Sequence, residues 1–313
     1  MPFLPEHCRL NEPEHSRFYR SIATGLFSGN APCKHPRAVL LGGQPGSGKT
    51  KMREQAIEEL SSLVINADDL RDYHPMYERL KLSEPERASF LVNEDVSLWT
   101  RKLIQQAVEE KRNIVFDGTF GSSDKKMIAD TLTLFRDNGY ETQLWALAVP
   151  ADLSKLGIYL RNEMQLMQTG SGRFVSMKVH DLNYRNIPDN IEMAVKNSLV
   201  NQVRIFSRSV DRVNDRMANN RINVAYSLGK ADADFKKAAD IFLQVRDEPL
   251  PAVLKSYFSI RFNEVVSMID KRLNNALKTN EMDRAKSIVD YKNQFLMALG
   301  ANRNENKTIK IEL

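Results

Sequence analysis

The sequence predicts an α/β fold in which a parallel sheet is flanked by helices, with a C-terminal helical extension. Short apolar runs alternate with helical patterns over residues 37–210, which is typical of a parallel sheet covered on both faces. A glycine-rich segment joins the first strand to the next helix. Beyond about residue 210 the strand pattern stops, and apolar stripes at helical spacing follow.

The chain has 313 residues, of which 42% are hydrophobic and 27% charged, the balance of a globular protein. We divide it into a helical N-terminal segment (1–36), a core (37–210) and a C-terminal helical region (211–313). Its cysteines, Cys8 and Cys33, form no paired motif, which indicates a reducing compartment. The sequence has no apolar run of 18 residues, and its first 15 residues do not show the basic and then apolar pattern expected of a Sec-type leader. We therefore expect a cytoplasmic protein without a membrane span, and export by a dedicated machine is left open.

The net charge of +5 is not spread evenly along the chain. Residues 1–200 contain 25 Lys or Arg and 26 Asp or Glu, whereas residues 201–313 contain 20 and 14, so the net charges are −1 and +6. The basic residues of the second part are interleaved with acidic and apolar ones, a pattern typical of solvated helix faces. We therefore favour solvated helix faces over a nucleic-acid surface in this part of the chain.

Each element follows from local apolar patterns and turn signals. The strands are short apolar runs, most of them ended by glycine, aspartate or proline, and the helices repeat apolar residues every three or four positions. The predicted strands are 38–41, 63–65, 113–116, 141–149 and 203–206. The predicted helices are a lead-in within 1–36, then 48–60, 84–110, 123–137, 151–168 and 189–201, and a hairpin of 254–277 and 282–299.

The segment after the first of these strands matches the pattern G-x-x-x-x-G-K-[ST]. It consists of Gly43, Gln44, Pro45, Gly46, Ser47, Gly48, Lys49 and Thr50. Glycines let consecutive backbone N–H groups turn toward a phosphate, and the following helix adds the positive end of its dipole. Lys49 can bridge the terminal phosphates, and the Thr50 hydroxyl can hold Mg²⁺. The position between a strand and a helix favours nucleotide binding over a glycine-rich turn that binds nothing.

Two aspartates follow strands at the same edge of the predicted sheet. Asp68 ends the second strand, where a carboxylate either accepts the proton of an acceptor hydroxyl during phosphoryl transfer or caps a helix. Spacing alone does not choose between these roles. Asp117 ends the third strand, where an acid organises Mg²⁺, binds acceptor hydroxyls or forms a tight turn. Thr119 adds a hydroxyl at the same edge.

Arg161 and Arg173 flank the Gly170–Gly172 loop. Arginines beside flexible glycines suggest a lid whose guanidinium groups reach the transferring phosphate, although surface ion pairing is the more common role of an arginine. His180, followed by Asp181, is either a contact or a helix-end residue. The five histidines show no metal-ligand spacing.

In this order, the motifs resemble those of the zeta toxin family of P-loop kinases. The resemblance runs from about Leu40 to His180 and more weakly to about Arg208. Its parts are the phosphate loop, the acid after the second strand with His74-Pro75 behind it, the acid-Gly-Thr at 117–119, Gly139–Thr142 before an Ala-Val-Pro strand end, and the paired arginines ahead of His180-Asp181. The ordered set is specific, and it implies a P-loop kinase-like fold.

The resemblance also implies an activity. Zeta toxins phosphorylate the 3′-hydroxyl of the aminosugar in UDP-N-acetylglucosamine, using ATP or GTP and Mg²⁺. The product blocks cell-wall precursor synthesis in bacteria, and a helical antitoxin normally restrains the enzyme. By resemblance, this chain is therefore expected to be a toxin kinase with a nucleotide-sugar substrate and an antitoxin partner.

Carried over by position, the resemblance assigns roles to individual residues. Asp68 is the base, and Arg161 and Arg173 stabilise the transferred phosphate together with Lys49. Thr50 is expected to bind Mg²⁺, and Asp117 is a second candidate ligand because of its position at the end of a strand. The residues expected to contact the acceptor are Asp117, Thr119 and Asp95.

Two departures from the family leave alternatives open. Family members commonly have Glu-Gly-Thr with an arginine two residues later, whereas this chain has an aspartate and no arginine in the segment 117–121. The shorter acid moves its carboxylate by about an ångström, enough to select another acceptor, such as a dinucleotide or a nucleic-acid 5′-end. The added C-terminal helices either stabilise the core, restrain it in cis or bind a partner. A nucleotide-controlled effector or binding protein is the third functional class.

Overall fold

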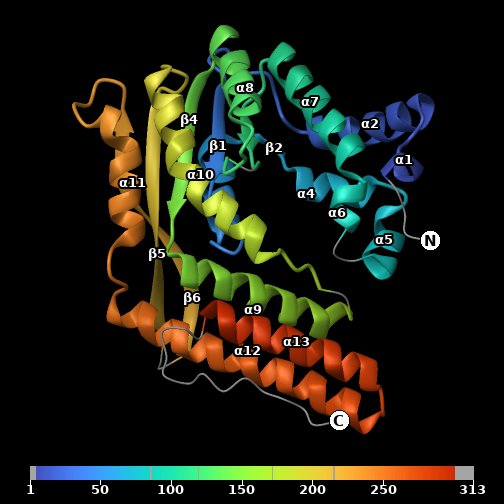
Figure 1. Cartoon of the computed structure of the whole chain (residues 1–313). Coiled ribbons are helices and arrows are strands. Elements are labelled where there is room, and N and C mark those ends of the chain that lie inside the picture. Colours follow the sequence, from blue (N-terminus) through green and yellow to red (C-terminus); the bar gives the residue numbers. More distant parts are fainter. Residues whose placement is uncertain (1–4, 85–86, 119, 171, 214–215, 300–313) are drawn as a thin grey trace.

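A six-stranded sheet forms the centre of the computed structural model, which describes residues 5–84, 87–118, 120–170, 172–213 and 216–299 (Figure 1). The strand order is β2-β3-β1-β4-β5-β6, and every neighbouring pair is parallel except β5 and β6. The strands are β1 (Arg37–Gly42), β2 (Leu63–Ile65), β3 (Ile114–Phe116), β4 (Glu141–Ala148), β5 (Gln202–Val213) and β6 (Arg216–Gly229). The predicted α/β class with a mainly parallel sheet is confirmed.

Helices connect the parallel strands and extend the chain at both ends. Those before β4 are α1 (Pro5–Cys8), α2 (Glu12–Phe27), α3 (Lys49–Leu60), α4 (Ala67–Leu70), α5 (Tyr77–Ser83), α6 (Ala88–Leu91), α7 (Asn93–Glu109) and α8 (Lys125–Asp137). Those after β4 are α9 (Ala151–Thr169), α10 (Met177–Lys196), α11 (Ala238–Asp247), α12 (Ala252–Lys278) and α13 (Met282–Leu299). Two short 3₁₀ turns lie at Arg71–Tyr73 and Phe235–Lys237.

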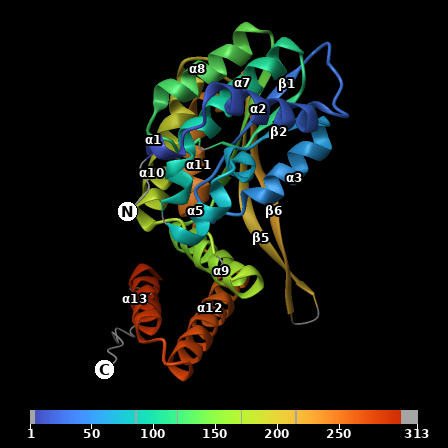
Figure 2. The same cartoon turned by 90° about the vertical axis from the view of Figure 1, so that its right-hand side faces the viewer.

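Alternating side chains of the central strands build a core on each face of the sheet. In β1, Ala38 and Leu40 pack with α2, α7, α8, α10 and α11, whereas Val39 and Leu41 pack with α3 and the starts of α9 and α12. Figure 2 shows α8 and α10 on one side of β5 and α3 on the other. Because both faces are covered, the strands are apolar throughout, which is the pattern from which they were predicted.

The predicted helical hairpin near the C-terminus is confirmed as α12 and α13. It lies along α9 (Figure 1), and the three helices share a separate apolar cluster that includes Tyr159, Phe262, Ile269, Ile288 and Phe295. None of the helices in the described part of the chain combines the length and the apolar composition that a membrane span requires.

The expectation that strands stop near residue 210 is wrong. β5 continues to Val213, and β6 returns beside it as an antiparallel edge strand. An edge strand needs only one covered face, so its sequence is too polar to resemble the buried strands. The signal that reveals it is an alternation of apolar residues at Ile222, Val224, Tyr226 and Leu228. The division at 36 and 210 stays a prediction.

One helix boundary also differs from the prediction. The helix expected at 189–201 begins at Met177, where the Ser176 side chain caps it, and it contains Pro188. A proline normally marks a helix boundary, which is why the pattern before it is easily missed. The early start brings His180 into the first turn of α10.

Candidate active site

The phosphate loop leaves β1 after Gly42 and enters α3 at Lys49. Gly46 and Gly48 have φ values of 77° and 99°, which only glycine adopts without strain. A Cβ atom on Gly46 would also overlap the Ser154 carbonyl oxygen and lie 2.8 Å from the Ile158 nitrogen. The loop is therefore held in contact with the first turns of α9.

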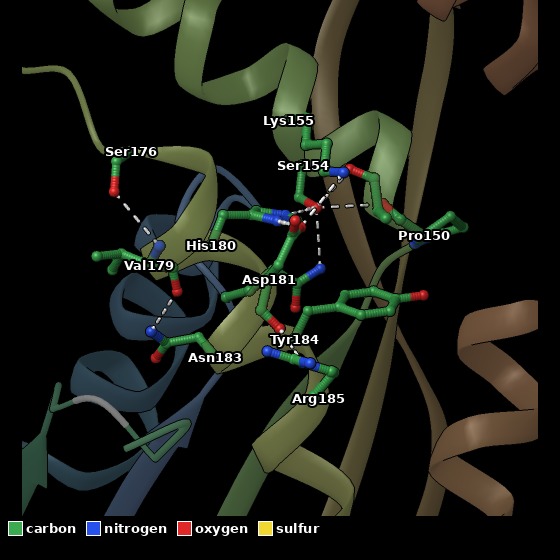
Figure 3. Close-up of polar contacts among 12 residues, drawn as sticks. Pro150, Ser154, Lys155, Ser176, Val179, His180, Asp181, Asn183, Tyr184 and Arg185 are labelled. Atoms are coloured by element: carbon green, nitrogen blue, oxygen red, sulfur yellow. Dashed lines mark hydrogen bonds and ion pairs between the residues drawn. The ribbon is translucent and has the colours of Figure 1, made fainter. Parts of the chain in front are cut away.

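A chain of buried hydrogen bonds braces this loop (Figure 3). Gln44, only 1% exposed, donates from Nε2 to Val149 O at 2.7 Å and to Ser154 Oγ at 3.0 Å. Ser154 Oγ lies 2.8 Å from Nε2 of His180, and Nδ1 of His180 lies 2.8 Å from Asp181 Oδ1. His180 is therefore a buried contact that ties α10 to the phosphate loop through α9.

Asp117 faces the phosphate-loop lysine. Lys49 Nζ lies 3.6 Å from Asp117 Oδ1 and 3.5 Å from the Gly118 carbonyl oxygen. Asp117 Oδ2 accepts a hydrogen bond from Asn66 Nδ2 at 3.1 Å and lies 3.7 Å from Arg53 Nη1. This carboxylate is thus directed toward the phosphate-binding side by two residues of α3 and by the N-cap residue of α4.

The carboxylate of Asp68 contacts the guanidinium groups of Arg71 and Arg173. The helix-cap interpretation of Asp68 is wrong, because Asn66 caps α4 and its side chain accepts from the Asp68 N–H at 2.8 Å. Burial would raise the pKa of Asp68, but Arg173, Arg71 and Lys49 together hold it below its ordinary value. Asp68 is therefore ionised at neutral pH.

Arg161 lies on α9, near the same group of charges. Burial, and then repulsion from Arg173, lower its pKa, while Asp68 acts in the opposite direction. Arg173 reaches Asp68 from the segment after α9, where its backbone N–H donates to Gln165 Oε1 at 2.9 Å. The predicted base therefore contacts Arg173 and interacts through its charge with Arg161.

The donor set at the phosphate loop fits Mg²⁺. This ion is usually held by one or two carboxylates together with substrate phosphates and water, and Asp117 with the exposed Thr50 hydroxyl supplies that kind of set. Among the described residues, no three His, Cys, Asp or Glu side chains are grouped so that they could hold a metal by themselves. A nucleotide would therefore have to supply the remaining ligands.

Two of the residues expected at the acceptor, Thr119 and Asp95, are not seen to take part in the site. Thr119 lies outside the described residues. Asp95 is 2% exposed, and its Oδ2 accepts from the Leu10 N–H at 3.1 Å and lies 3.3 Å from Nε2 of His74. Asp95 thus fastens the N-terminal segment to α7 and the turn after α4, and its role at the acceptor stays a prediction.

The sequence motifs do not include several residues of the site. Arg53 and Arg71 lie one turn after Lys49 and Asp68, so helical spacing from a motif acid or base could have found them. A cavity of about 230 Å³ also opens beside the phosphate loop. It is lined by Ser47, Gly48, Thr50, Lys51, Arg208, Arg221 and Ile222. The last three come from β5 and β6, for which no short motif exists.

Comparison with known sequences gives one family and several relatives. The family described as Zeta toxin matches residues 23–224. Toxin zeta of Streptococcus pyogenes and that of Enterococcus hirae are each 33% identical over 187 residues, 58% of this chain and 64% of their own length. Toxin PezT of Streptococcus pneumoniae serotype 4 is 26% identical over 210 residues, 65% of this chain and 82% of that protein. The chain therefore matches slightly less than two thirds of the two Toxin zeta proteins.

Solved structures agree with the fold. A chain from the PezAT chromosomal toxin-antitoxin system of Streptococcus pneumoniae superimposes with a TM-score of 0.69 and 22% identity, covering 83% of this chain and 99% of that one. AvrRxo1-ORF1:AvrRxo1-ORF2 with sulphate ions gives a TM-score of 0.52 and 14% identity over 94% and 90% of the two chains. At these identities the likeness concerns the fold, and the P-loop kinase-like architecture is confirmed.

Proposed function

Because this chain belongs to the zeta toxin family, we propose that it is a kinase that transfers the γ-phosphate of ATP or GTP to a nucleotide sugar. The proposed acceptor is the 3′-hydroxyl of UDP-N-acetylglucosamine, and the product would poison cell-wall synthesis. The observation that carries the proposal is the contact of Asp68, just beyond β2, with Arg173, near Lys49 of the phosphate loop. A carboxylate and cations arranged in this way suit an acceptor hydroxyl and a transferring phosphate.

The charges of the site residues suggest which part of the nucleotide or of its metal ion each residue binds. Backbone N–H groups of the phosphate loop and Lys49 bind the β- and γ-phosphates, and Arg161 and Arg173 stabilise the charge that the γ-phosphate carries during transfer. Mg²⁺, held by Thr50 and Asp117, supplies further charge neutralisation when it is bound. The Lys49–Asp117 distance of 3.6 Å supports this division, because it brings the proposed metal ligand beside the phosphate-binding lysine.

Asp68 is proposed to orient the acceptor hydroxyl and to accept its proton. Its lowered pKa makes it a weak base but keeps it ionised. This is sufficient because phosphoryl transfer passes through a loose transition state that depends mainly on positioning. The phosphates of a nucleotide compete with Asp68 for Arg173, so nucleotide binding would release the carboxylate toward the acceptor.

The decisive test compares Asp68→Asn, Lys49→Ala and Asp72→Asn in the full chain. Asp68→Asn should lower kcat by about 10²- to 10⁴-fold without weakening nucleotide affinity, whereas Lys49→Ala should lower both kcat and nucleotide affinity. Asp72 is an exposed acid in the next turn, where its carboxylate lies 4.0 Å from Lys81, so its substitution should leave turnover unchanged. Full turnover of Asp68→Asn would overturn the assignment of the base.

The identity of the acceptor needs a separate test. Asp117 is directed toward Lys49 and Asn66, an arrangement that favours the metal role over direct contact with a sugar. A related kinase for a dinucleotide or a nucleic-acid 5′-end therefore remains the alternative. Screening acceptors with γ-labelled ATP separates these classes, because phosphorylation of a nucleic-acid end should fall steeply with salt. Preferential labelling of UDP-N-acetylglucosamine would support the first proposal.

We also propose a bacterial cytoplasmic setting with a helical antitoxin as partner. Support comes from the PezAT chain, which belongs to a chromosomal toxin-antitoxin system. Expression of the chain alone should arrest bacterial growth, and Lys49→Ala combined with Asp68→Asn should remove the arrest. Persistent arrest by that double variant would favour a nucleotide-controlled effector that needs no phosphoryl transfer.

A further inference from the structure

We propose that the hairpin of α12 and α13 positions the arginine loop (172–175), and that Tyr291 on α13 is the positioning residue through which it acts. The catalytic consequence rests on the proposed function, because it concerns Arg173 and Arg161. The structural part, that Tyr291 fixes the conformation of the loop, does not depend on it. Three sets of contacts carry the inference.

The first set is a cluster of aromatic rings beside Arg173. Phe174, the next residue, lies 5.3 Å from Tyr159 of α9 and 5.5 Å from Tyr291, measured between ring centroids. Tyr159 and Tyr291 are themselves 5.4 Å apart. Aromatic contacts at these distances are favourable beyond their burial. Since Phe174 is held between the helices, the backbone that carries Arg173 is anchored at its C-terminal side.

The second set joins the Tyr291 hydroxyl to α9. Asn162 Nδ2 donates to this hydroxyl at 2.9 Å, and Asn162 directly follows Arg161. Asn162 also borders the arginine loop, because a Cβ atom on Gly172 would overlap its Oδ1 and lie 2.9 Å from Leu166 Cγ. This one hydrogen bond to α13 therefore fixes a side chain that directly follows Arg161 in the sequence and borders Gly172, the residue before Arg173.

The third set is an ion pair one residue further along α9. Arg272 of α12 donates to both carboxylate oxygens of Glu163, at 2.9 and 2.7 Å, and the Glu163 side chain is fully buried. Two consecutive residues after Arg161 are thus held by the hairpin. A two-point contact of this kind limits the rotation and sliding of α9 that would displace the Arg161 guanidinium.

Positioning and restraint in cis predict opposite changes in activity when the hairpin is loosened. If the hairpin blocked the site, loosening it would raise activity. If it positions Arg173, loosening it should lower activity, because misplacing a catalytic group by about 1 Å can lower the rate 10²-fold. Nucleotide affinity should change little when the hairpin is loosened, since Lys49 and the phosphate loop supply most of the binding.

The experiment uses the full chain with Tyr291→Ala, Tyr291→Phe, Phe174→Leu and Ile288→Ala. Ile288 is the matched control, because it lies one turn before Tyr291 in the same buried cluster and cannot hydrogen-bond Asn162. Two readouts are measured: kcat with nucleotide Kd, and the rate of trypsin cleavage between Arg173 and Phe174, followed by mass spectrometry. Cleavage by trypsin reports local opening of the loop and does not depend on any kinase activity of the chain.

Tyr291→Ala should lower kcat by about 10- to 100-fold and speed cleavage after Arg173 by a similar factor, with Kd changed by less than about twofold. Tyr291→Phe and Phe174→Leu should show smaller shifts of the same sign, and they serve as the test if Tyr291→Ala does not fold. Unchanged cleavage, a raised kcat, or equal effects from Ile288→Ala would overturn the proposal. An inactive wild type would refute the proposed function, whereas the cleavage readout would still test the positioning.

Discussion

Gln44 in the phosphate loop donates a hydrogen bond to the hydroxyl of Ser154 in the first turns of α9, across 3.0 Å. The same helix carries Arg161 and is followed by the loop with Arg173. α9 therefore connects the residues expected to bind the nucleotide phosphates with those expected to stabilise the transferred one. We therefore expect its contacts with the phosphate loop and with the C-terminal hairpin to determine how accurately the two groups face each other.

The contact between the phosphate loop and α9 predicts a severe effect of Gly46→Ala. The new Cβ atom would combine a φ of 77° with overlap of the Ser154 carbonyl oxygen. We expect a loss of at least about 2 kcal/mol in the free energy of unfolding and loss of nucleotide binding. Denaturant titration and calorimetric titration with ATP measure these two quantities.

Gly25→Ala is the matched control for this substitution. Gly25 lies inside α2, and a Cβ atom there would meet nothing within 4 Å. Replacing a helical glycine by alanine should raise the free energy of unfolding by about 0.5–1 kcal/mol. If Gly46→Ala were as stable as the wild type and bound ATP normally, the proposed close contact with α9 would be incorrect.

The buried contacts of His180 with Ser154 and Asp181 predict that the stability of the fold depends on pH. Burial, together with Lys155, lowers the pKa of His180, although Asp181 and Asp152 oppose the shift. Tyr184 stacks against the ring at 6.0 Å, and Ser154 faces Nε2. Because the pKa in the folded state is below the unfolded value, the stability that the neutral ring contributes is complete above about pH 6.5. It is lost as the pH falls from there toward the folded pKa, by at most about 1.4 kcal/mol per pH unit.

The test measures the free energy of unfolding of wild type and His180→Gln between pH 8 and 5. The difference between them should shrink as the pH falls, since glutamine keeps a polar atom near Ser154 but does not titrate. His35→Gln, at an exposed position, is the control and should change the free energy of unfolding little. A constant difference for His180→Gln would mean that this ring does not titrate in the expected direction.

The central part of the fold could be predicted because its causes are local in sequence. Strands buried on both faces are apolar throughout, and a phosphate loop requires glycines and a lysine at fixed positions. The pairing of β6 with β5 follows from no such motif, since the edge strand is exposed on one side. The continuous helix through Pro188 depends on tertiary packing that overrides a local signal.

The partners of the site residues were harder to predict than the residues themselves. Asp68 follows from its position after a strand, but its contact with Arg173 depends on how α9 crosses the sheet. Likewise, the sequence predicts apolar packing for α12 and α13, while the contacts of Tyr291 with Phe174 and Asn162 depend on where the hairpin meets α9. Contacts between segments far apart in the chain leave no periodic pattern in either segment.

The buried ion pair between Glu163 and Arg272 predicts a large loss of stability for Arg272→Met. Removing the guanidinium group leaves a buried carboxylate without its main partner, which should cost about 3–5 kcal/mol of the free energy of unfolding at pH 7. Burial raises the pKa of Glu163 even beside Arg272, and without the arginine it should rise further. The loss should therefore diminish toward pH 5, because the protonated carboxyl is neutral and costs less to bury.

Arg284→Met is the matched control for this prediction. Arg284 forms an ion pair of 2.8 Å with Glu281 near the turn of the same hairpin, but both side chains are exposed. Its removal should leave the free energy of unfolding at pH 7 nearly unchanged, because exposed ion pairs contribute little. Equal small losses in both variants would show that the contact between α12 and α9 contributes little, and the hairpin would then have to act on Arg161 through Tyr291 alone.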